Sequence, residues 1–285
     1  MPDSDDRSAI EATLPEEHVA FVEYLREKYD VPDDGLPGFR SRFVRSEETA
    51  REQLSVVMDH RIPVLALGIG SPAWAVEAAH EQGSLIVSLV GAPTHAESAI
   101  RAGADLLVAQ GTDAGGHTGP IGTFSLVPQV VEVAGGRPVL AAGDVATGRH
   151  LAAALALGAD GVWMGTAFLA SVEAQPSRSL LDKLLAAGPG DTVISRSASG
   201  KTLRMLRSAW SDEWEAPGAP TPLGMPYQDI LIGDILGQIL RHEVTPLVHE
   251  GAGQGVSHLT AQEPVAEIMD RLVAEADQVL ADLGT

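Results

Sequence analysis

Cysteine is absent from this chain of 285 residues, and aromatic residues make up only 4% of it. The absence of cysteine excludes disulfide bonds, thiolate metal sites and a cysteine nucleophile. Because aromatic side chains are scarce, the core must consist mainly of alanine, valine, leucine and isoleucine. The histidines show no spacing typical of metal ligands, so we expect no metal site.

Positive charge is scarce as well. The chain carries 19 lysine and arginine residues against 39 aspartate and glutamate residues, which gives a formal net charge of −20. Such a surface repels nucleic acids and anionic membranes, so we expect neither as a partner. The chain shows no apolar run of about 18 residues, and we expect no signal peptide because its first residues are acidic. We therefore expect a soluble, cytoplasmic protein; whether it forms a homo-oligomer stays open.

Five short apolar runs recur along the middle of the chain. Each ends in glycine or a small polar residue, and each is nearly continuous, which is typical of strands buried on both faces of a parallel sheet. Helical patterns separate several of them, so the order is that of a repeated strand–helix unit. The runs are IPVLALGIG (62–70), SLIVSLVG (84–91), DLLVAQG (105–111), PVLAAGD (138–144) and DGVWMGTAFL (160–169).

The flanking segments differ from this pattern. Residues 1–60 are acidic and contain two helical patterns, over 14–29 and 47–60, without a good strand. Residues 173–285 form a region that we expect to be helical, with a Pro/Gly loop over 211–226. The pattern over residues 172–208 also predicts helix, with a break at GPGD. The sequence thus predicts an α/β fold of the (β/α)8-barrel type, incomplete because only five strands are legible, with the strands in residues 61–172.

The first chemical motif is VAQGTDAGGHTGP, which follows the third apolar run. Its glycines let backbone N–H groups approach a ligand closely, and His117 lies among them. Loops at the carboxyl ends of parallel strands are where α/β folds bind ligands, and a histidine there can act as a base near neutral pH. We therefore predict a functional role for His117 rather than that of an ordinary surface histidine.

The second motif covers the last two runs, which end in the turns Ala142–Gly143–Asp144 and Gly165–Thr166. Two adjacent glycine turns that lead into helices are typical of a phosphate site late in an α/β barrel. Ordinary packing between strands and helices would also need small residues at these turns. Because the turns come as a pair, the sequence favours phosphate binding.

Together these segments resemble the nitronate monooxygenase family, formerly called 2-nitropropane dioxygenases. The likeness lies in AGADLLVAQGTDAGGHTG and in PVLAAGDVATGRHLAAALALGADGVWMGTAFLAS, and more weakly in SGKTLRML (199–206) and GAGQGVSHL (251–259). It implies a TIM barrel that binds FMN and oxidises alkyl nitronates with molecular oxygen. By the same likeness, the chain is expected to begin after the third strand of the family's barrel.

The resemblance also implies roles for individual residues. His117 is expected to be the catalytic base or the group that orients the nitronate. Gln110 is expected to hydrogen-bond the flavin ring, and the turns of the second motif to hold its phosphate. One departure is Asp144, where the family usually has glycine, because a carboxylate beside a phosphate is repulsive. The expected cofactor contacts are Gln110, Gly115, Gly116, Gly143, Asp144, Trp163, Met164, Gly165 and Thr166.

Two other functions stay open at this point. The glycine–histidine loop is similar to that of the FMN-dependent enoyl-acyl carrier protein reductases, which would oxidise NADH in the presence of an enoyl thioester. A shortened, inactive remnant of the flavin fold acting as a binding module is the second alternative, because five strands leave open edges that favour association.

Overall fold

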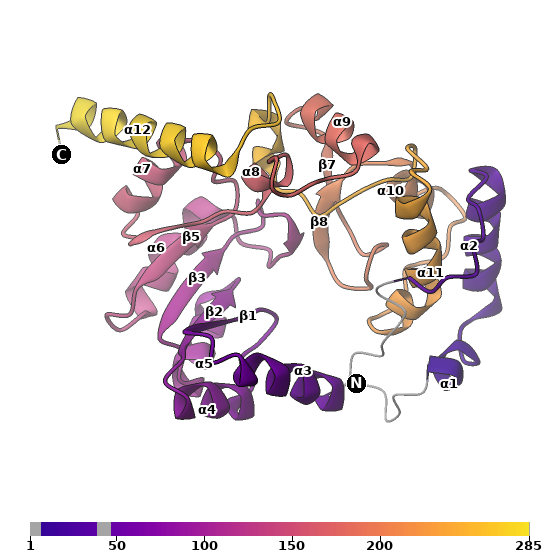
Figure 1. Cartoon of the computed structure of the whole chain (residues 1–285), viewed down its shortest axis with the longest axis horizontal. Helices are drawn as coiled ribbons and strands as arrows, with labels where there is room; N and C mark the ends of the chain where they lie inside the picture. The colour runs from indigo at the N-terminus through magenta and orange to yellow at the C-terminus, as the bar shows by residue number, and fades with distance from the viewer. Residues whose placement is uncertain (1–6, 39–46, 285) are drawn as a thin grey trace.

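A five-stranded parallel sheet forms the centre of the computed structural model, which describes residues 7–38 and 47–284. The strands lie in the order β1-β2-β3-β5-β6, so each pairs with the next strand of the repeat along the chain (Figure 1). All five predicted strands are confirmed, and the α/β fold with them. Their bounds are β1 (Val64–Leu67), β2 (Leu85–Val90), β3 (Leu106–Gln110), β5 (Val139–Ala142) and β6 (Gly161–Trp163).

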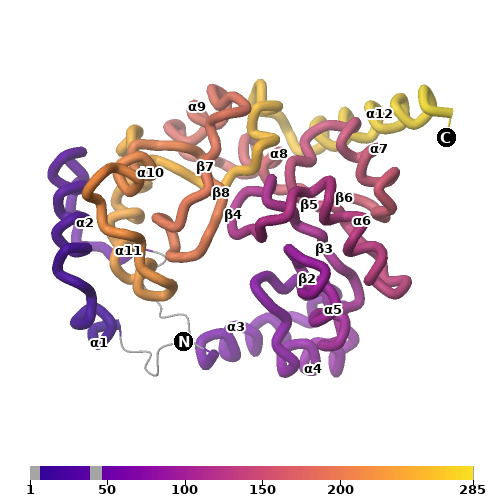
Figure 2. The backbone as a smooth tube through the Cα atoms, turned by 180° about the vertical axis from the view of Figure 1, so that it is seen from behind, coloured from indigo at the N-terminus to yellow at the C-terminus, as the bar shows by residue number. Residues whose placement is uncertain are grey.

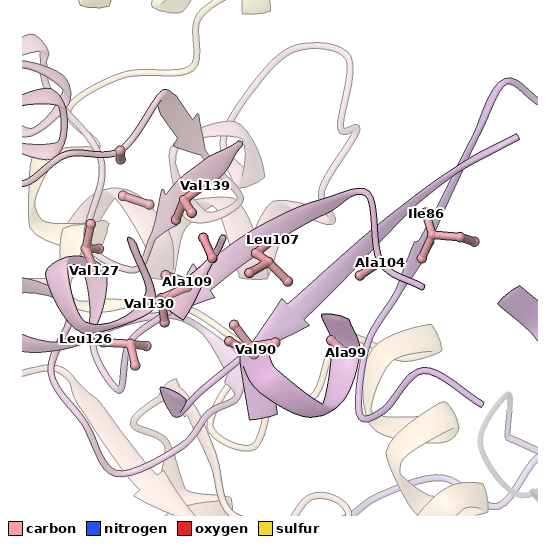
Figure 3. Packing of buried hydrophobic residues seen from close by; sticks show 14 of the residues in the cluster. Ile86, Val90, Ala99, Ala104, Leu107, Ala109, Leu126, Val127, Val130 and Val139 are labelled. Atoms are coloured by element: carbon pink, nitrogen blue, oxygen red, sulfur yellow. The ribbon is translucent and has the colours of Figure 1, made fainter. Parts of the chain in front are cut away.

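One face of the sheet is covered by helices. The buried side chains on this face, such as Ile86, Leu107 and Val139, alternate along the strands with residues of the opposite face. They pack with Val90, Leu126 and the other residues of the main hydrophobic cluster (Figure 3). The covering helices are α4 (Ala73–Glu81), α5 (Pro93–Ala102), α6 (Thr123–Val133) and α7 (Gly148–Ala156).

The opposite face of the sheet is only partly covered. Leu85 is 55% exposed and Trp163 is 40% exposed, although both are large apolar side chains in strands. Strands β1 and β6 each pair with one neighbour, so the sheet does not close into a barrel within the described residues. The predicted incomplete barrel is confirmed in this respect.

The described part of the first 60 residues contains the helices α1 (Arg7–Glu11), α2 (Glu16–Lys28) and α3 (Glu47–Asp59). Helices α2 and α3 match the two predicted helical patterns, and the short helix α1 was not predicted. Helix α2 packs on α11 (Tyr227–Arg241), on the side of the molecule away from the five-stranded sheet (Figure 1). A second hydrophobic core, which contains Trp210, Trp214 and Ile232, joins these distant segments.

The helical prediction for residues 172–208 is wrong in its second half. Only α9 (Arg178–Ala186) is a helix there, and it is followed by the antiparallel strands β7 (Thr192–Ser195) and β8 (Leu203–Leu206). Strand β8 also pairs with the short strand β4 (Gly116–His117), which makes a three-stranded sheet (Figure 2). Each strand is only four residues or fewer, so pairing with a distant segment, not local pattern, determines its structure.

The C-terminal region ends in an amphipathic helix, α12 (Val265–Leu283), which packs along α7 (Figure 1). Helix α8 (Thr166–Leu169) follows β6, α10 (Ala209–Trp214) follows β8, and a short 3-10 helix, η1 (Gln254–His258), precedes α12. Among the described residues, no helix is both long and apolar enough to cross a membrane.

Candidate functional site

The loop after β3 is held in a defined conformation by pairing at both ends. The Gln110 side-chain amide donates to the backbone carbonyl of His117, at 3.1 Å. Gly116 and His117 then pair with Arg204 and Leu203 of β8. The predicted glycine-rich loop thus contains a two-residue strand, and His117 has a fixed backbone position.

His117 has a side-chain partner that sequence reasoning missed. Its Nε2 lies 2.8 Å from the hydroxyl Oγ of Ser199, which is 0% exposed. The two residues are separated by 82 positions, so no local pattern links them. The only sequence signal at Ser199 is its place in the weakly matching segment SGKTLRML.

The glycines of the two motifs differ in what surrounds them. A Cβ on Gly115 would lie 2.7 Å from the Ala252 backbone, and one on Gly143 would lie 2.4 Å from Thr123 Oγ1. These two glycines therefore allow close packing of the protein on itself. A Cβ on Gly165 would meet nothing within 4 Å, so the backbone there borders open space. Gly116 likewise has no neighbour within 4 Å, and its φ of +80° is one that L side chains rarely adopt.

A cavity of about 740 Å³ lies beside His117. None of its lining residues is acidic, although the chain has 39 carboxylates, while Lys201, His95 and His117 line it with several hydroxyl groups. The cavity therefore favours an anionic ligand. Its lining is Gly68, Ile69, Gly70, Ser71, Leu89, Val90, Gly91, His95, Ser98, Ala99, Gln110, His117, Thr118, Gly119, Lys201 and Thr202.

A second cavity, of about 270 Å³, contains most of the predicted cofactor contacts. It is lined by Gln110, Gly115, Gly143, Asp144, Trp163, Met164, Gly165 and Thr166, together with residues that were not predicted, among them Gly251 and Gly255. Gly116 lines neither cavity. Both cavities share Leu89 and Gln110 in their linings, so the histidine loop and the paired glycine turns lie on neighbouring parts of one site.

Two features of the smaller cavity bear on anion binding. The first amide of α7, that of Gly148, donates to the carboxylate of Glu275 at 2.8 Å, so α12 already caps this helix. The hydroxyl of Thr166 accepts a hydrogen bond from the amide of Gly253 at 2.8 Å and keeps its own proton to donate. An anion in this cavity would therefore meet the Gly143 and Gly165 turns rather than the start of α7.

Asp144 is the acidic residue of the smaller cavity. Its φ of +59° is a left-handed conformation, which aspartate adopts more readily than most residues. Burial raises the pKa of its carboxyl group, and the neighbouring Asp113 acts in the same direction. Burial also lowers the pKa of His150 nearby. The structure thus places a carboxyl group that resists ionisation at the predicted phosphate site.

The fold and the cavities together define a class: an α/β protein of the TIM-barrel type with two adjoining cavities at the carboxyl ends of its parallel strands, where this fold binds ligands. Among residues 7–38 and 47–284, no group of three potential ligands could hold a metal ion. Residues 39–275 match the sequence model of the nitronate monooxygenase family. The chain belongs to this family, as its two motifs predicted.

Individual relatives agree with this assignment. A Mycobacterium tuberculosis protein with a monooxygenase name is 45% identical over 233 residues, which cover 80% of this chain and 62% of the relative. A Staphylococcus aureus protein with a nitronate monooxygenase name is 31% identical over 250 residues, which cover 83% of this chain and 69% of the relative. The chain therefore spans about two thirds of the length of these proteins.

Among solved structures, a nitroalkane oxidase from Streptomyces ansochromogenes superimposes with a TM-score of 0.81 at 26% sequence identity. The match covers 99% of this chain and 80% of that structure. This likeness extends the agreement from sequence to the arrangement of the strands and helices.

Proposed function

We propose that this protein is an FMN-dependent oxidoreductase that oxidises alkyl nitronates with molecular oxygen. One observation carries the proposal. Gln110 lines both the cavity beside His117 and the cavity beside the paired glycine turns, so the two cavities adjoin. Membership of the nitronate monooxygenase family supports the same reaction.

The residues of the smaller cavity fit a flavin mononucleotide. Gly165 borders open space, so its backbone is accessible to a phosphate, and the Thr166 hydroxyl can donate to one. Gln110 connects the two cavities and is suited to contact the flavin ring, with Trp163 and Met164 along the side. Asp144 is the exception, and its raised pKa reduces the repulsion that its carboxylate would cause. When bound, FMN supplies the redox chemistry of the reaction.

The chain itself contributes orientation and charge in the larger cavity. A nitronate is an anion, and the absence of acidic groups from the lining together with Lys201 and His117 favours its binding. For a neutral nitroalkane, His117 would take the proton from the carbon next to the nitro group. For a nitronate, the protonated imidazole would offset its negative charge instead.

A flavin titration combined with kinetics tests the proposal. Purified protein should bind FMN and consume oxygen when an alkyl nitronate is added, and His117→Asn should keep the flavin while losing about a hundredfold or more in kcat/KM. Full activity of His117→Asn would contradict the role of this residue. A protein that binds no FMN would favour the inactive binding module, and NADH oxidation with an enoyl thioester would favour the enoyl reductase.

A further inference from the structure

We propose that Ser199 is a positioning residue for His117: its hydroxyl accepts a hydrogen bond from Nε2–H and fixes which imidazole nitrogen carries the proton. The contact of 2.8 Å between Ser199 Oγ and His117 Nε2 is short for a bond between a hydroxyl and a ring nitrogen. Ser199 is 0% exposed, so water does not compete for this bond.

The direction of the bond follows from the other contacts of the hydroxyl. Ser199 Oγ donates to the carbonyl of Lys201 at 3.3 Å and accepts from the amide of Lys201 at 3.4 Å. A hydroxyl has one proton and two lone pairs. If His117 donates from Nε2, all three contacts are satisfied; if Ser199 donates to Nε2, the carbonyl contact is lost. With the Nε2–H tautomer, the Ser199 hydroxyl uses its one proton and both of its lone pairs. The lone pair of the neutral imidazole is then on Nδ1.

The segment that carries Ser199 is itself held in place. The Arg196 guanidinium donates twice to the carbonyl of Gly200, at 3.1 and 3.0 Å. Gly200 has a φ of +78°, and a Cβ there would lie 2.5 Å from the carbonyl oxygen of Leu223. The side chain of Gln228 donates to the carbonyl of Ser197, at 3.0 Å. The hydroxyl is thus presented to His117 by a buried, preorganised turn rather than by a free loop.

The protonated ring can make the same hydrogen bond. An imidazolium donates from Nε2 through a charge-assisted hydrogen bond, which is stronger than a neutral one. The charged and titratable groups in its surroundings are Lys201 and His95 in the cavity lining and Arg204 opposite β4. Lys201 and Arg204 are cationic and oppose a further positive charge on the ring, and a hydrogen bond from Nε2–H to the Ser199 hydroxyl offsets part of this effect.

Nitrogen NMR of the histidine side chains in the flavin-free protein tests the inference, with the His117 signal assigned by its loss in His117→Asn. The wild type should show the Nε2–H tautomer. In Ser199→Ala, the pH midpoint of this signal should fall by roughly 0.4 to 1 unit, because one hydrogen bond to the cation is lost. Ser197→Ala is the matched control: it removes a buried hydroxyl from the same turn that does not contact His117, and it should leave the signal unchanged.

Kinetics provides a second readout, which rests on the proposed function. Ser199→Ala should reduce kcat/KM about three- to tenfold and shift the acidic side of its pH profile, while FMN affinity stays the same. Ser199→Cys, with a weaker donor and acceptor, should give intermediate values, and it decides the question if the alanine variant does not fold. An unchanged His117 signal in both Ser199 variants would overturn the inference, whether or not the protein oxidises nitronates.

Discussion

Replacement of Asp144 by asparagine should tighten the binding of FMN. The side chain keeps its size, and asparagine also tolerates the left-handed backbone at this position, where φ is +59°. The change therefore removes a negative charge from the smaller cavity and little else. Because the phosphate of FMN is also anionic, its repulsion by the carboxylate should disappear.

The size of the effect follows from the exposure of Asp144. Two unit charges 4 Å apart interact by about 1 kcal/mol in water and about 4 kcal/mol at an effective dielectric constant of 20. Asp144 is only partly buried, so solvent screens part of this repulsion, and a value of about 1 to 2 kcal/mol is expected. This corresponds to a dissociation constant that is roughly five- to thirtyfold lower in Asp144→Asn.

The difference in FMN affinity between wild type and Asp144→Asn should depend on pH. Burial raises the pKa of Asp144, so the wild-type carboxyl group becomes neutral as the pH falls through this raised value. The affinities of wild type and Asp144→Asn should therefore converge on acidification and differ most at a pH well above this raised value. Both proteins share His150, His258, Asp113 and Arg204 around the site, and the ratio of their affinities isolates the Asp144 charge.

Quenching of FMN fluorescence during titration measures both constants. Asp182→Asn in α9 is the matched control, because it removes one charge from an exposed position outside both cavities. It should leave FMN affinity unchanged. Equal affinities of wild type and Asp144→Asn at high pH, or a ratio that grows towards acid, would refute the placement of the phosphate beside Asp144.

Two further predictions concern stability. Gly115→Ala should lower the free energy of unfolding by about 1 to 3 kcal/mol, because its Cβ would lie 2.7 Å from the Ala252 backbone. Gly165→Ala, with nothing within 4 Å, should not; equal urea midpoints for the two variants would contradict this packing. Hydrogen bonds from Arg241 hold the pKa of Asp34 below its ordinary value, so the stability that Asp34 contributes is present above that ordinary value and is lost as the pH falls through the lowered one. The Tm difference between wild type and Asp34→Asn should therefore shrink on acidification, and a difference that grows would show the opposite linkage.

Much of the sheet and part of the site were predictable from local pattern. Each strand of the five-stranded sheet is a nearly continuous apolar run, a pattern typical of parallel strands, although the face opposite the helices is only partly covered here. Parallel strands place their carboxyl ends at one edge, so Gln110, Gly143 and Gly165, each at or just after the end of a strand, could be assigned to one site without coordinates.

Only the tertiary structure determined which residues the site residues and the short strands contact. Ser199 meets His117 across 82 residues, and β7 and β8 form only because they pair with each other and with β4. The space around each glycine and the partial burial of Asp144 likewise depend on which distant segment packs against them. Hydrophobic periodicity records which face of a segment is buried, whereas hydrogen-bond partners and pKa shifts depend on distances between segments that the linear sequence does not contain.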